Sequence, residues 1–494
     1  MSAPPNRGNI VEIPLSGEFS TSSSHYHSAA VVNDSNTRDD TSHSHRLQED
    51  VRESSVDRGR ADRRSILVVL AAFVIMFTSC GINFAFGVYQ ELYETMSRSS
   101  SSNPFTGATP AQIDLIGTLA ISLMTLGAPF ASAWCKSYSP RTITFAGGVM
   151  FALSNVLASF GQKLWHFILT QGILLGCGVC LTYIPAMTVA PGWFTTHRGL
   201  AIGIVSSGTG VGGVAWAPLL RYLNNHMGFR DTLRLTGAIS FILLGASATA
   251  LTWAPEFERR DRVETQTSRT RFLVPLVDWR VARSRKFIAQ CISAALQSSA
   301  YYAPVFFFSA YARSLGYSAA AGATFIAVSN GASAVGKIII GHMADRLGRL
   351  NTLLFTTFVS AITSLGLWLP STLSGGDRDG KSLFAAFAIL YGIFAGAYIS
   401  LFPTALVELF GVQHFASVNG FLYMARGFAA LVGTPVAGVL IRGSGGGVDG
   451  LWAAKAYQKT SILIGALLAA ATVGVAWMRI EAAISGSNRL RWKA

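Results

Sequence analysis

Long runs of apolar residues recur along almost the whole chain. Six fill the first half, at about 66–89, 111–133, 142–161, 166–189, 199–220 and 232–253. Six more follow a polar stretch, at about 287–309, 319–341, 351–370, 382–404, 417–441 and 456–478. An apolar run of about 18 or more residues can cross the hydrocarbon core of a bilayer as a helix. The pattern therefore predicts an all-α membrane protein of 12 transmembrane helices in two six-helix bundles.

The polar stretches between these runs predict the domain organisation. Residues 1–64 are rich in Ser, Arg, Asp and His. Such a segment cannot bury enough apolar surface to fold, so we expect a disordered cytosolic tail. We expect bundles at 65–253 and 287–480, a cytosolic linker at 254–286 and a short tail at 481–494.

Composition and charge agree with a membrane protein. Half of the 494 residues are hydrophobic and 13% are charged, against about 25% charged in soluble domains. The net charge of +14 at first suggests nucleic acid as a partner. The basic residues, however, lie in tails and loops, which is the pattern that orients membrane helices. We expect the lipid bilayer as a partner and no nucleic acid.

The distribution of Lys and Arg predicts the orientation in the membrane. The central loop, the N-terminal flank and the C-terminal tail are basic and lie on one side if the helix number is even. The positive-inside rule then places both termini in the cytosol, and we expect the protein in the plasma membrane. Arg221, Arg230 and Arg234 fall on the opposite side and do not fit this rule.

Two spans of the two halves share an internal spacing. Gly203 is followed by Gly210 seven residues later and by Pro218 eight residues after that. The same spacing recurs in Gly420, Gly427 and Pro435. Matching Gly and Pro positions in corresponding helices are typical of transporters built from repeats, with a binding site between the halves.

The sharpest motif begins in the eighth span and continues into a short loop. Its residues are Gly341, Asp345, Arg346, Gly348 and Arg349. Here the chain resembles the major facilitator superfamily, whose signature is G-x-x-x-D-R-x-G-R. The resemblance implies a loop that latches the inward-closed state. Asp345 can pair with an arginine and cap a helix start; the alternative is an ordinary basic turn.

A second motif precedes the fifth span. Arg198-Gly199-Leu200-Ala201-Ile202-Gly203 opens a glycine-rich helix, and it resembles the monocarboxylate porter family. The resemblance covers about residues 65–480 and is greatest to the fungal branch. It implies alternating access and an organic anion as substrate. We expect gating roles for Arg198 and for the close-packing glycines Gly203, Gly210, Gly420 and Gly427.

Polar residues inside the spans are the candidates for substrate binding, because each is costly in lipid. Lys337 lies in the eighth span, with Ser333 and Asn330 four and seven residues before it on one helical face. In animal monocarboxylate porters an arginine near this position binds the substrate carboxylate. The resemblance therefore favours Lys337 as the carboxylate ligand. The alternative is a lysine whose ammonium snorkels to the interface.

Arg426 is the second candidate and lies near the middle of the eleventh span. It binds substrate or pairs with a polar residue of another helix. Asn83 of the first span and Gln297 of the seventh complete the predicted binding set. Hydrogen bonds between helices explain these two amides equally well.

The energy source is less clear from the sequence. No Asp or Glu lies centrally in a span; Asp114 and Glu408 lie near span ends. Val88 stands near the position at which animal monocarboxylate porters have a lysine. A proton relay needs a titratable group in the membrane, so protons remain a candidate partner only. The chain lacks a GxxxxGK[ST] loop, which argues against ATP-driven transport.

These observations predict a secondary active transporter that moves a small organic anion, a monocarboxylate or an acidic secondary metabolite. The alternatives are an exporter of a neutral metabolite or toxin, and a non-transporting nutrient sensor on the same fold. We expect no enzyme activity, because the spans show no clustered His or acidic residues. We expect no cofactor and no metal.

Overall fold

The computed structural model describes residues 63–99, 103–194, 197–255, 277, 279–442 and 453–485. Most of the expected N-terminal tail and of the central linker therefore lies outside the described residues. The described ranges contain helices and turns and no strand. All of them belong to one compact unit, Ala61–Ala494.

The first half consists of six helical rods. The first begins at Arg63 and includes η1 (Met76–Cys80), α2 (Gly81–Phe84) and α3 (Gly87–Arg98). The next rods are α4 (Pro110–Leu126) with α5 (Ala128–Tyr138), α6 (Pro140–Ser159), and α7 (Leu164–Phe167) with η2 (Ile168–Leu174), α8 (Leu175–Val189) and η3 (Ala190–Trp193). The last two are the arms of α9 (Arg198–Ala250), which breaks at Gly228 with φ 79°.

The second half repeats this arrangement. Its elements are α11 (Trp279–Ala282), α12 (Arg285–Ser314), α13 (Ala319–Leu347), α14 (Arg349–Thr363) with η4 (Ser364–Trp368) and α15 (Leu369–Ser374), α16 (Arg378–Arg442), η5 (Ala454–Tyr457) and α17 (Gln458–Ser485). α16 breaks at Gly411 with φ 73°. Glycine tolerates such a positive φ without a side-chain clash, so the breaks in α9 and α16 each turn one long helix into two arms.

The helices account for the 12 predicted spans. Among the described residues, 9 helices are long and apolar enough to cross a membrane, and 10 if α4 and α5, bent by 49°, form one span. Two further spans come from the break of α9 at Gly228 and from α12. α12 is 30 residues long, but it is more polar than the helices counted above. The predicted all-helical fold is confirmed. The first span is longer than predicted, because its helix continues through Glu91 and Glu94 to Ser97.

Serine and threonine caps fix where several helices begin. At α4, Thr109 and Gln112 form a reciprocal capping box and Pro110 follows. Ser284 and Ser318 accept backbone N–H groups at the starts of α12 and α13. Such caps satisfy backbone donors that lack partners within the helix.

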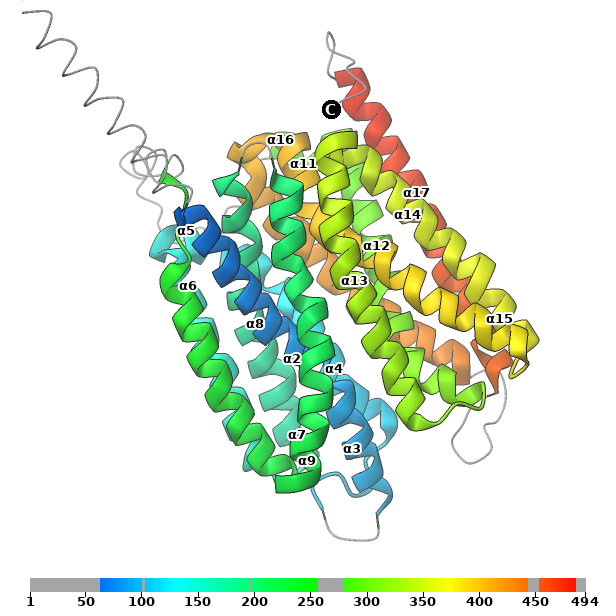
Figure 1. Cartoon of the computed structure of the whole chain (residues 1–494). Coiled ribbons are helices and arrows are strands. Elements are labelled where there is room, and N and C mark those ends of the chain that lie inside the picture. The colour runs from blue at the N-terminus through cyan, green and yellow to red at the C-terminus, as the bar shows by residue number, and fades with distance from the viewer. Residues whose placement is uncertain are drawn as a thin grey trace, which may run out of the picture. The chain divides into compact units, whose positions relative to one another are not determined.

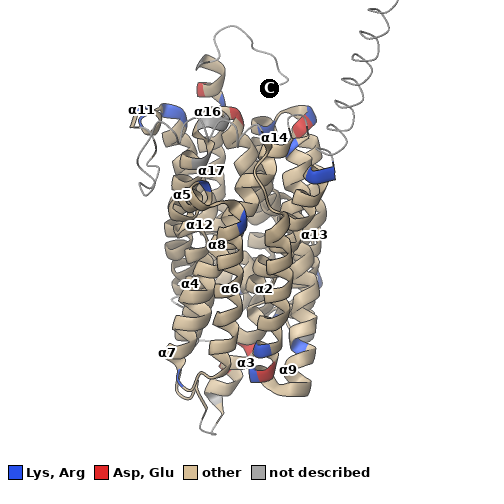
Figure 2. Cartoon of the chain, turned by 90° about the vertical axis from the view of Figure 1, so that its left-hand side faces the viewer, with Lys and Arg blue, Asp and Glu red and all other residues tan. Residues whose placement is uncertain are grey.

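The two ends of the helices differ in charge. We call the end that carries Arg64, Arg141, Arg198, Arg349 and Arg479 the basic end, and the opposite end the far end. Figure 2 shows charged residues near both ends and few between them. The helices run between these ends, with the C-terminal end of α17 at the top of Figure 1, the basic end.

The buried core is distributed unevenly between the halves. The largest core joins both halves and includes Met187 and Ile202 with Ala344, Leu350 and Phe402. A second core, with Tyr311, Trp368, Phe384 and Tyr457, belongs to the second half alone. A small cluster of Ile121, Tyr302 and Ala430 connects the halves near mid-depth. Among the described residues, the shared core thus connects the halves near the basic end, at Ala344 and Leu350, and continues through the first half to Tyr93 and Phe167 near the far end.

Candidate functional site

Glycines of α9 produce the closest approach between the halves. A Cβ at Gly203 would overlap the backbone carbonyl of Lys337 on α13, and one at Gly210 would overlap that of Asn330. α9 and α13 therefore touch backbone to backbone. In Figure 1 they lie side by side at the top and separate toward the bottom. We call this contact the first seam.

Asp345 joins the first seam at the basic end. Its Oδ1 accepts the backbone N–H of Gly199 at 2.8 Å, and its Oδ2 accepts that of Leu200 at 2.9 Å. Arg349 Nη2 lies 3.4 Å from Oδ1. The carboxylate thus caps the N-terminus of α9, where the helix dipole favours a negative charge. The two contacts predicted for Asp345, a helix start and an arginine, are both present.

The other motif residues surround this capped helix end. A Cβ at Gly341 would overlap the carbonyl of Gly199. Gly348 has φ 92° and links α13 to α14. Arg346 is exposed, and Arg198 donates from Nε to the carbonyl of Phe194. Asp345 is therefore the residue of this group that bridges the halves by hydrogen bonds.

Lys337 lies inside the first seam. Its side chain crosses to α9, where Nζ donates to Thr209 Oγ1 at 2.5 Å and to the carbonyl of Ser206 at 3.3 Å. The residue is 2% exposed, so the ammonium does not snorkel to the interface. Among the described residues no carboxylate forms an ion pair with it.

Asn330 and Ser333 do not share one environment with Lys337. Asn330 packs against Gly213 of α9. Ser333 Oγ instead lies against Gly396 of α16 and has no hydrogen-bond partner in the described residues. The structure therefore brings Lys337 and Asn330 to the same neighbouring helix and turns Ser333 to another.

The second seam joins α16 to α4 and α5. A Cβ at Gly427 would lie 2.8 Å from Thr125 Oγ1 and from Leu126 Cγ. One at Gly420 would lie 3.1 Å from Pro129 Cα. Tyr183 of α8 and Tyr423 of α16, also from opposite halves, meet with their hydroxyl oxygens 3.2 Å apart.

Arg426 lies beside the second seam, in an aromatic box. Its Cζ is 4.7 Å from the ring centre of Phe402, 4.9 Å from that of Tyr423 and 5.0 Å from that of Tyr398. The residue is 2% exposed, and its Nε and Nη1 have no hydrogen-bond partner in the described residues. Aromatic faces attract a cation at such distances, but they do not accept hydrogen bonds as a carboxylate does.

More buried amides on α12 and α16 also have unpaired atoms. Gln297 and Asn419 are both 0% exposed, and neither amide has a hydrogen-bond partner in the part of the chain that the structure describes. Ser298, next to Gln297, donates to the carbonyl of Arg426 at 2.9 Å, so these helices touch at this level. Asn83, in α2, is 3% exposed with Nδ2 unpaired.

The acidic residues near span ends have partners outside the box. Gln90 Nε2 donates to Asp114 Oδ1 at 2.6 Å near the far end. Glu408 interacts electrostatically with Arg349 and Arg479 at the basic end. Neither carboxylate forms an ion pair with Arg426.

The amino-acid sequence matches the Major Facilitator Superfamily over residues 67–378, more than half of the chain. The chain belongs to the major facilitator superfamily. It is therefore a multi-pass membrane protein of a transporter family, and not an enzyme.

Fungal transporters of this superfamily are similar to the chain over most of their length. An MFS-type transporter of Gibberella moniliformis is 28% identical over 400 residues, covering 81% of this chain and 88% of the relative. The agnestins efflux protein of Paecilomyces divaricatus is 29% identical over 379 residues, covering 76% and 81%. The relation to fungal transporters is thus shown, while the finer relation to monocarboxylate porters stays a prediction.

The repeated glycines lie where the two halves of the major facilitator fold contact each other. Gly203 and Gly210 face the second half, and Gly420 and Gly427 face the first. Sequence reasoning did not identify the box residues Tyr398, Phe402 and Tyr423 or the nearby Asn419. Their spacing could have indicated shared helix faces, because Tyr398 and Phe402 are four residues apart and Asn419 lies seven residues before Arg426.

Proposed function

We propose that this protein is a secondary transporter that exports a small organic anion, an acidic secondary metabolite, across the plasma membrane. Efflux is suggested by the agnestins efflux protein, which is 29% identical. The anionic class is suggested by Arg426, whose aromatic box has no acid. The monocarboxylate porter resemblance supports the same class.

The observation that carries the proposal is that Nε and Nη1 of the Arg426 guanidinium have no hydrogen-bond partner in the described residues. Leaving a buried charge without a hydrogen-bonded partner costs several kcal/mol, about 3–5 when one partner of a pair is removed. The rings of Tyr398, Phe402 and Tyr423 offset part of this cost. A carboxylate on Nε and Nη1 would supply the missing acceptors and form charge-assisted hydrogen bonds.

The aromatic box also favours a substrate with a flat apolar body. A bound anion would place its carboxylate on the guanidinium and its flat body against the edges of these rings. Gln297 and Asn419 have donors and acceptors free for hydroxyl or carbonyl groups of the substrate. An aromatic acid that carries hydroxyl or carbonyl groups fits the rings and these amides better than a simple alkyl acid does.

Enclosure of Arg426 requires alternating access. Because the residue is 2% exposed, a substrate reaches it only when one seam opens. Opening the first seam at the basic end would break the bonds of Asp345 to α9 and those of Lys337 to Ser206 and Thr209. Lys337 would then be released, and only in that state could it meet a carboxylate.

We propose further that the basic end faces the cytosol, with both termini on that side. The positive-inside rule supports this orientation. Two of the three exceptions at the far end have local partners: Arg230 donates to the carbonyl of Gly161 at 3.2 Å, and Arg234 pairs with Asp231 at 2.9 Å. Their charge is thus held by hydrogen bonds within the first half.

Flux measurements in proteoliposomes test the proposal. Purified protein is reconstituted, and uptake is followed for a panel of aromatic acids, matched neutral compounds and cations. We expect saturable movement of acids above the level of empty vesicles. Movement of neutral or cationic compounds without the acids would contradict the anionic class. Repeating the assay with and without a pH gradient shows whether protons are coupled.

A further inference from the structure

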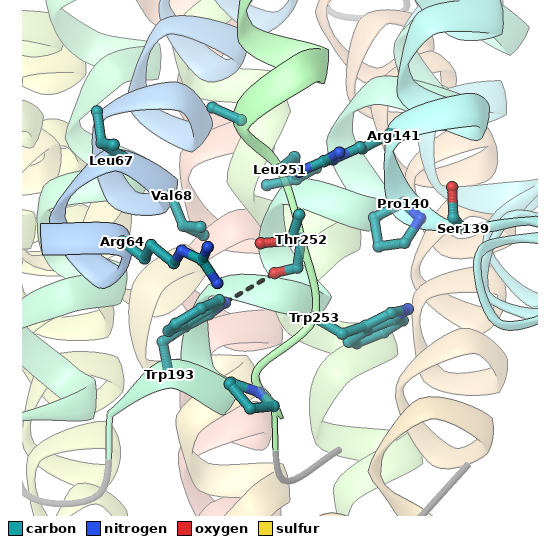
Figure 3. A pocket seen from close by; sticks show the side chains of 12 residues that line it. Arg64, Leu67, Val68, Ser139, Pro140, Arg141, Trp193, Leu251, Thr252 and Trp253 are labelled. Atoms are coloured by element: carbon teal, nitrogen blue, oxygen red, sulfur yellow. Dashed lines mark hydrogen bonds between the residues drawn. The ribbon is translucent and has the colours of Figure 1, made fainter. Parts of the chain in front are cut away.

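A cavity of about 560 Å³ lies at the basic end of the first half, apart from the residues predicted to bind substrate. Four segments contribute its walls: the start of the first rod, the turn between α5 and α6, η3, and the end of α9 with the residues that follow (Figure 3). We infer that this cavity is a second binding site, which takes a phosphate-bearing anion, in particular the headgroup of an anionic phospholipid.

Two arginines give the cavity its charge. Arg64 comes from the first rod and Arg141 from the first turn of α6, and their side chains reach the cavity from different helices (Figure 3). No carboxylate occurs among the described residues that line it. Neither guanidinium forms an ion pair in the described part of the chain. Arginine suits phosphate because its planar donors match two phosphate oxygens.

The walls of the cavity are suited to the membrane interface. Trp193 Nε1 donates to the carbonyl of Thr252 at 2.7 Å, which fixes one wall and is drawn as the dashed line in Figure 3. Trp253 lies in the wall beside it. Tryptophan is enriched at the level of lipid headgroups, so the cavity has an aromatic lining where a phosphate would sit in a bilayer.

An apolar side connects the cavity to the lipid. Leu67 lines it and is 55% exposed, and Ile66 and Leu70 on the same rod are 58% and 52% exposed. Acyl chains can therefore lie along the first rod while the phosphate reaches Arg64 and Arg141. Basic pockets between transmembrane helices are known to bind lipid headgroups. A soluble phosphate would use the arginines but not the exposed leucines.

The site is independent of the substrate proposal. Its lining residues all belong to the first half, so a rocking motion between the halves leaves the cavity intact. A bound lipid would tie the first rod to α6 and α9 in every state of the transport cycle. The inference depends only on the chain being a membrane protein.

Lipid binding to the purified full-length protein tests this site. Affinities for dioleoyl phosphatidic acid and dioleoyl phosphatidylcholine are measured by native mass spectrometry. The double variant Arg64→Gln with Arg141→Gln should lose about tenfold or more in affinity for phosphatidic acid and little for phosphatidylcholine. As a matched control, Arg221→Gln with Arg378→Gln removes two exposed arginines outside the cavity and should change neither affinity.

Additional arms keep the test decisive. Arg64→Lys with Arg141→Lys should retain most of the preference for phosphatidic acid, and it replaces the glutamine variant if that variant does not fold. Inorganic phosphate and glycerol phosphate are titrated as competitors. Displacement of the lipid by either at comparable concentration would support the phosphate site with a soluble ligand. Equal affinity of wild type for both lipids, or an unchanged preference in the glutamine variant, would overturn the inference.

Discussion

The two seams between the halves use the same glycine spacing but differ in their polar groups. The first seam, α9 against α13, contains two side chains that cross between the halves, Asp345 and Lys337. The second, α16 against α4 and α5, has glycine contacts near Gly420 and Gly427. The shared spacing explains the close packing, whereas the polar residues distinguish the seams: charged side chains cross the first, and the second adjoins the aromatic box that we propose binds substrate.

The repeat sharpens this comparison at one position. Thr209 precedes Gly210 as Arg426 precedes Gly427, so the two residues are equivalent. In the first seam the cation comes from the facing helix, as Lys337 bound to Thr209. In the second half the cation is Arg426, on α16 itself, and its Nε and Nη1 have no acceptor in the described residues. One buried cation is thus hydrogen-bonded across the seam, and the other is the one that we propose binds a ligand.

The largest expected effect comes from glycine in the first seam. Gly210→Val would force side-chain atoms into the backbone carbonyl of Asn330, and overpacking of this kind costs about 1–3 kcal/mol or more. We expect flux near background, measured as initial rate at equal reconstituted protein. Gly331→Ala is the matched control, since its Cβ would have only Val214 Cγ2 nearby, at 3.8 Å. Similar rates for both variants would argue against a close first seam.

The next effect is expected at Arg426. Arg426→Gln keeps polarity but removes the charge, and hydrogen bonds to charged groups are worth about 1.5–3 kcal/mol. We expect a loss of about 10- to 100-fold in kcat/KM for acids. Arg426→Lys should retain part of the activity, because it keeps the charge but not the planar donors. A normal kcat/KM in the glutamine variant would remove Arg426 from the site.

Lys337 should behave differently from Arg426. Lys337→Met keeps much of the side-chain volume and removes the bonds to Ser206 and Thr209. The change should weaken the closed first seam by about 1–3 kcal/mol and alter the maximal rate more than KM. Both constants come from the same flux assay. A rise in KM alone, as large as that for Arg426→Gln, would instead make Lys337 a substrate ligand.

The smallest effect is expected at Asp345. Asp345→Asn keeps one acceptor for the N-terminus of α9 but loses the negative charge that favours this position, worth about 0.3–2 kcal/mol. Thr125→Cys, buried in the second seam, reports opening by its labelling rate with a maleimide. The five native cysteines are first replaced. Labelling should rise by up to about tenfold, and an unchanged rate would mean that Asp345 does not hold the basic end closed.

Much of this architecture was predictable from the sequence. Apolar runs predicted the helices, and the matching offsets from Gly203 and Gly420 predicted two halves built on one repeat. The motif at Asp345 predicted its contacts with a helix start and an arginine. These features depend on local spacing or on backbone geometry, which a sequence records directly.

The environments of single polar side chains were not predictable. The sequence offers a lysine at 337 but not the partners Ser206 and Thr209, which are 131 and 128 residues away. Ser333 and Lys337 lie one turn apart, yet they contact different helices. The aromatic box was missed because Phe and Tyr are ordinary residues of membrane helices. Only packing of both arms of α16 brings Phe402 and Tyr423 around Arg426.

A comparison of one acid with its own amide tests directly whether Arg426 selects an anionic substrate. Flux of an aromatic carboxylic acid and of its uncharged primary amide is measured in vesicles with wild type and with Arg426→Gln. We predict that wild type prefers the acid by about tenfold or more and that the variant transports both equally slowly. An acid preference that survives in the variant, or wild-type transport of the amide at the rate of the acid, would contradict the account.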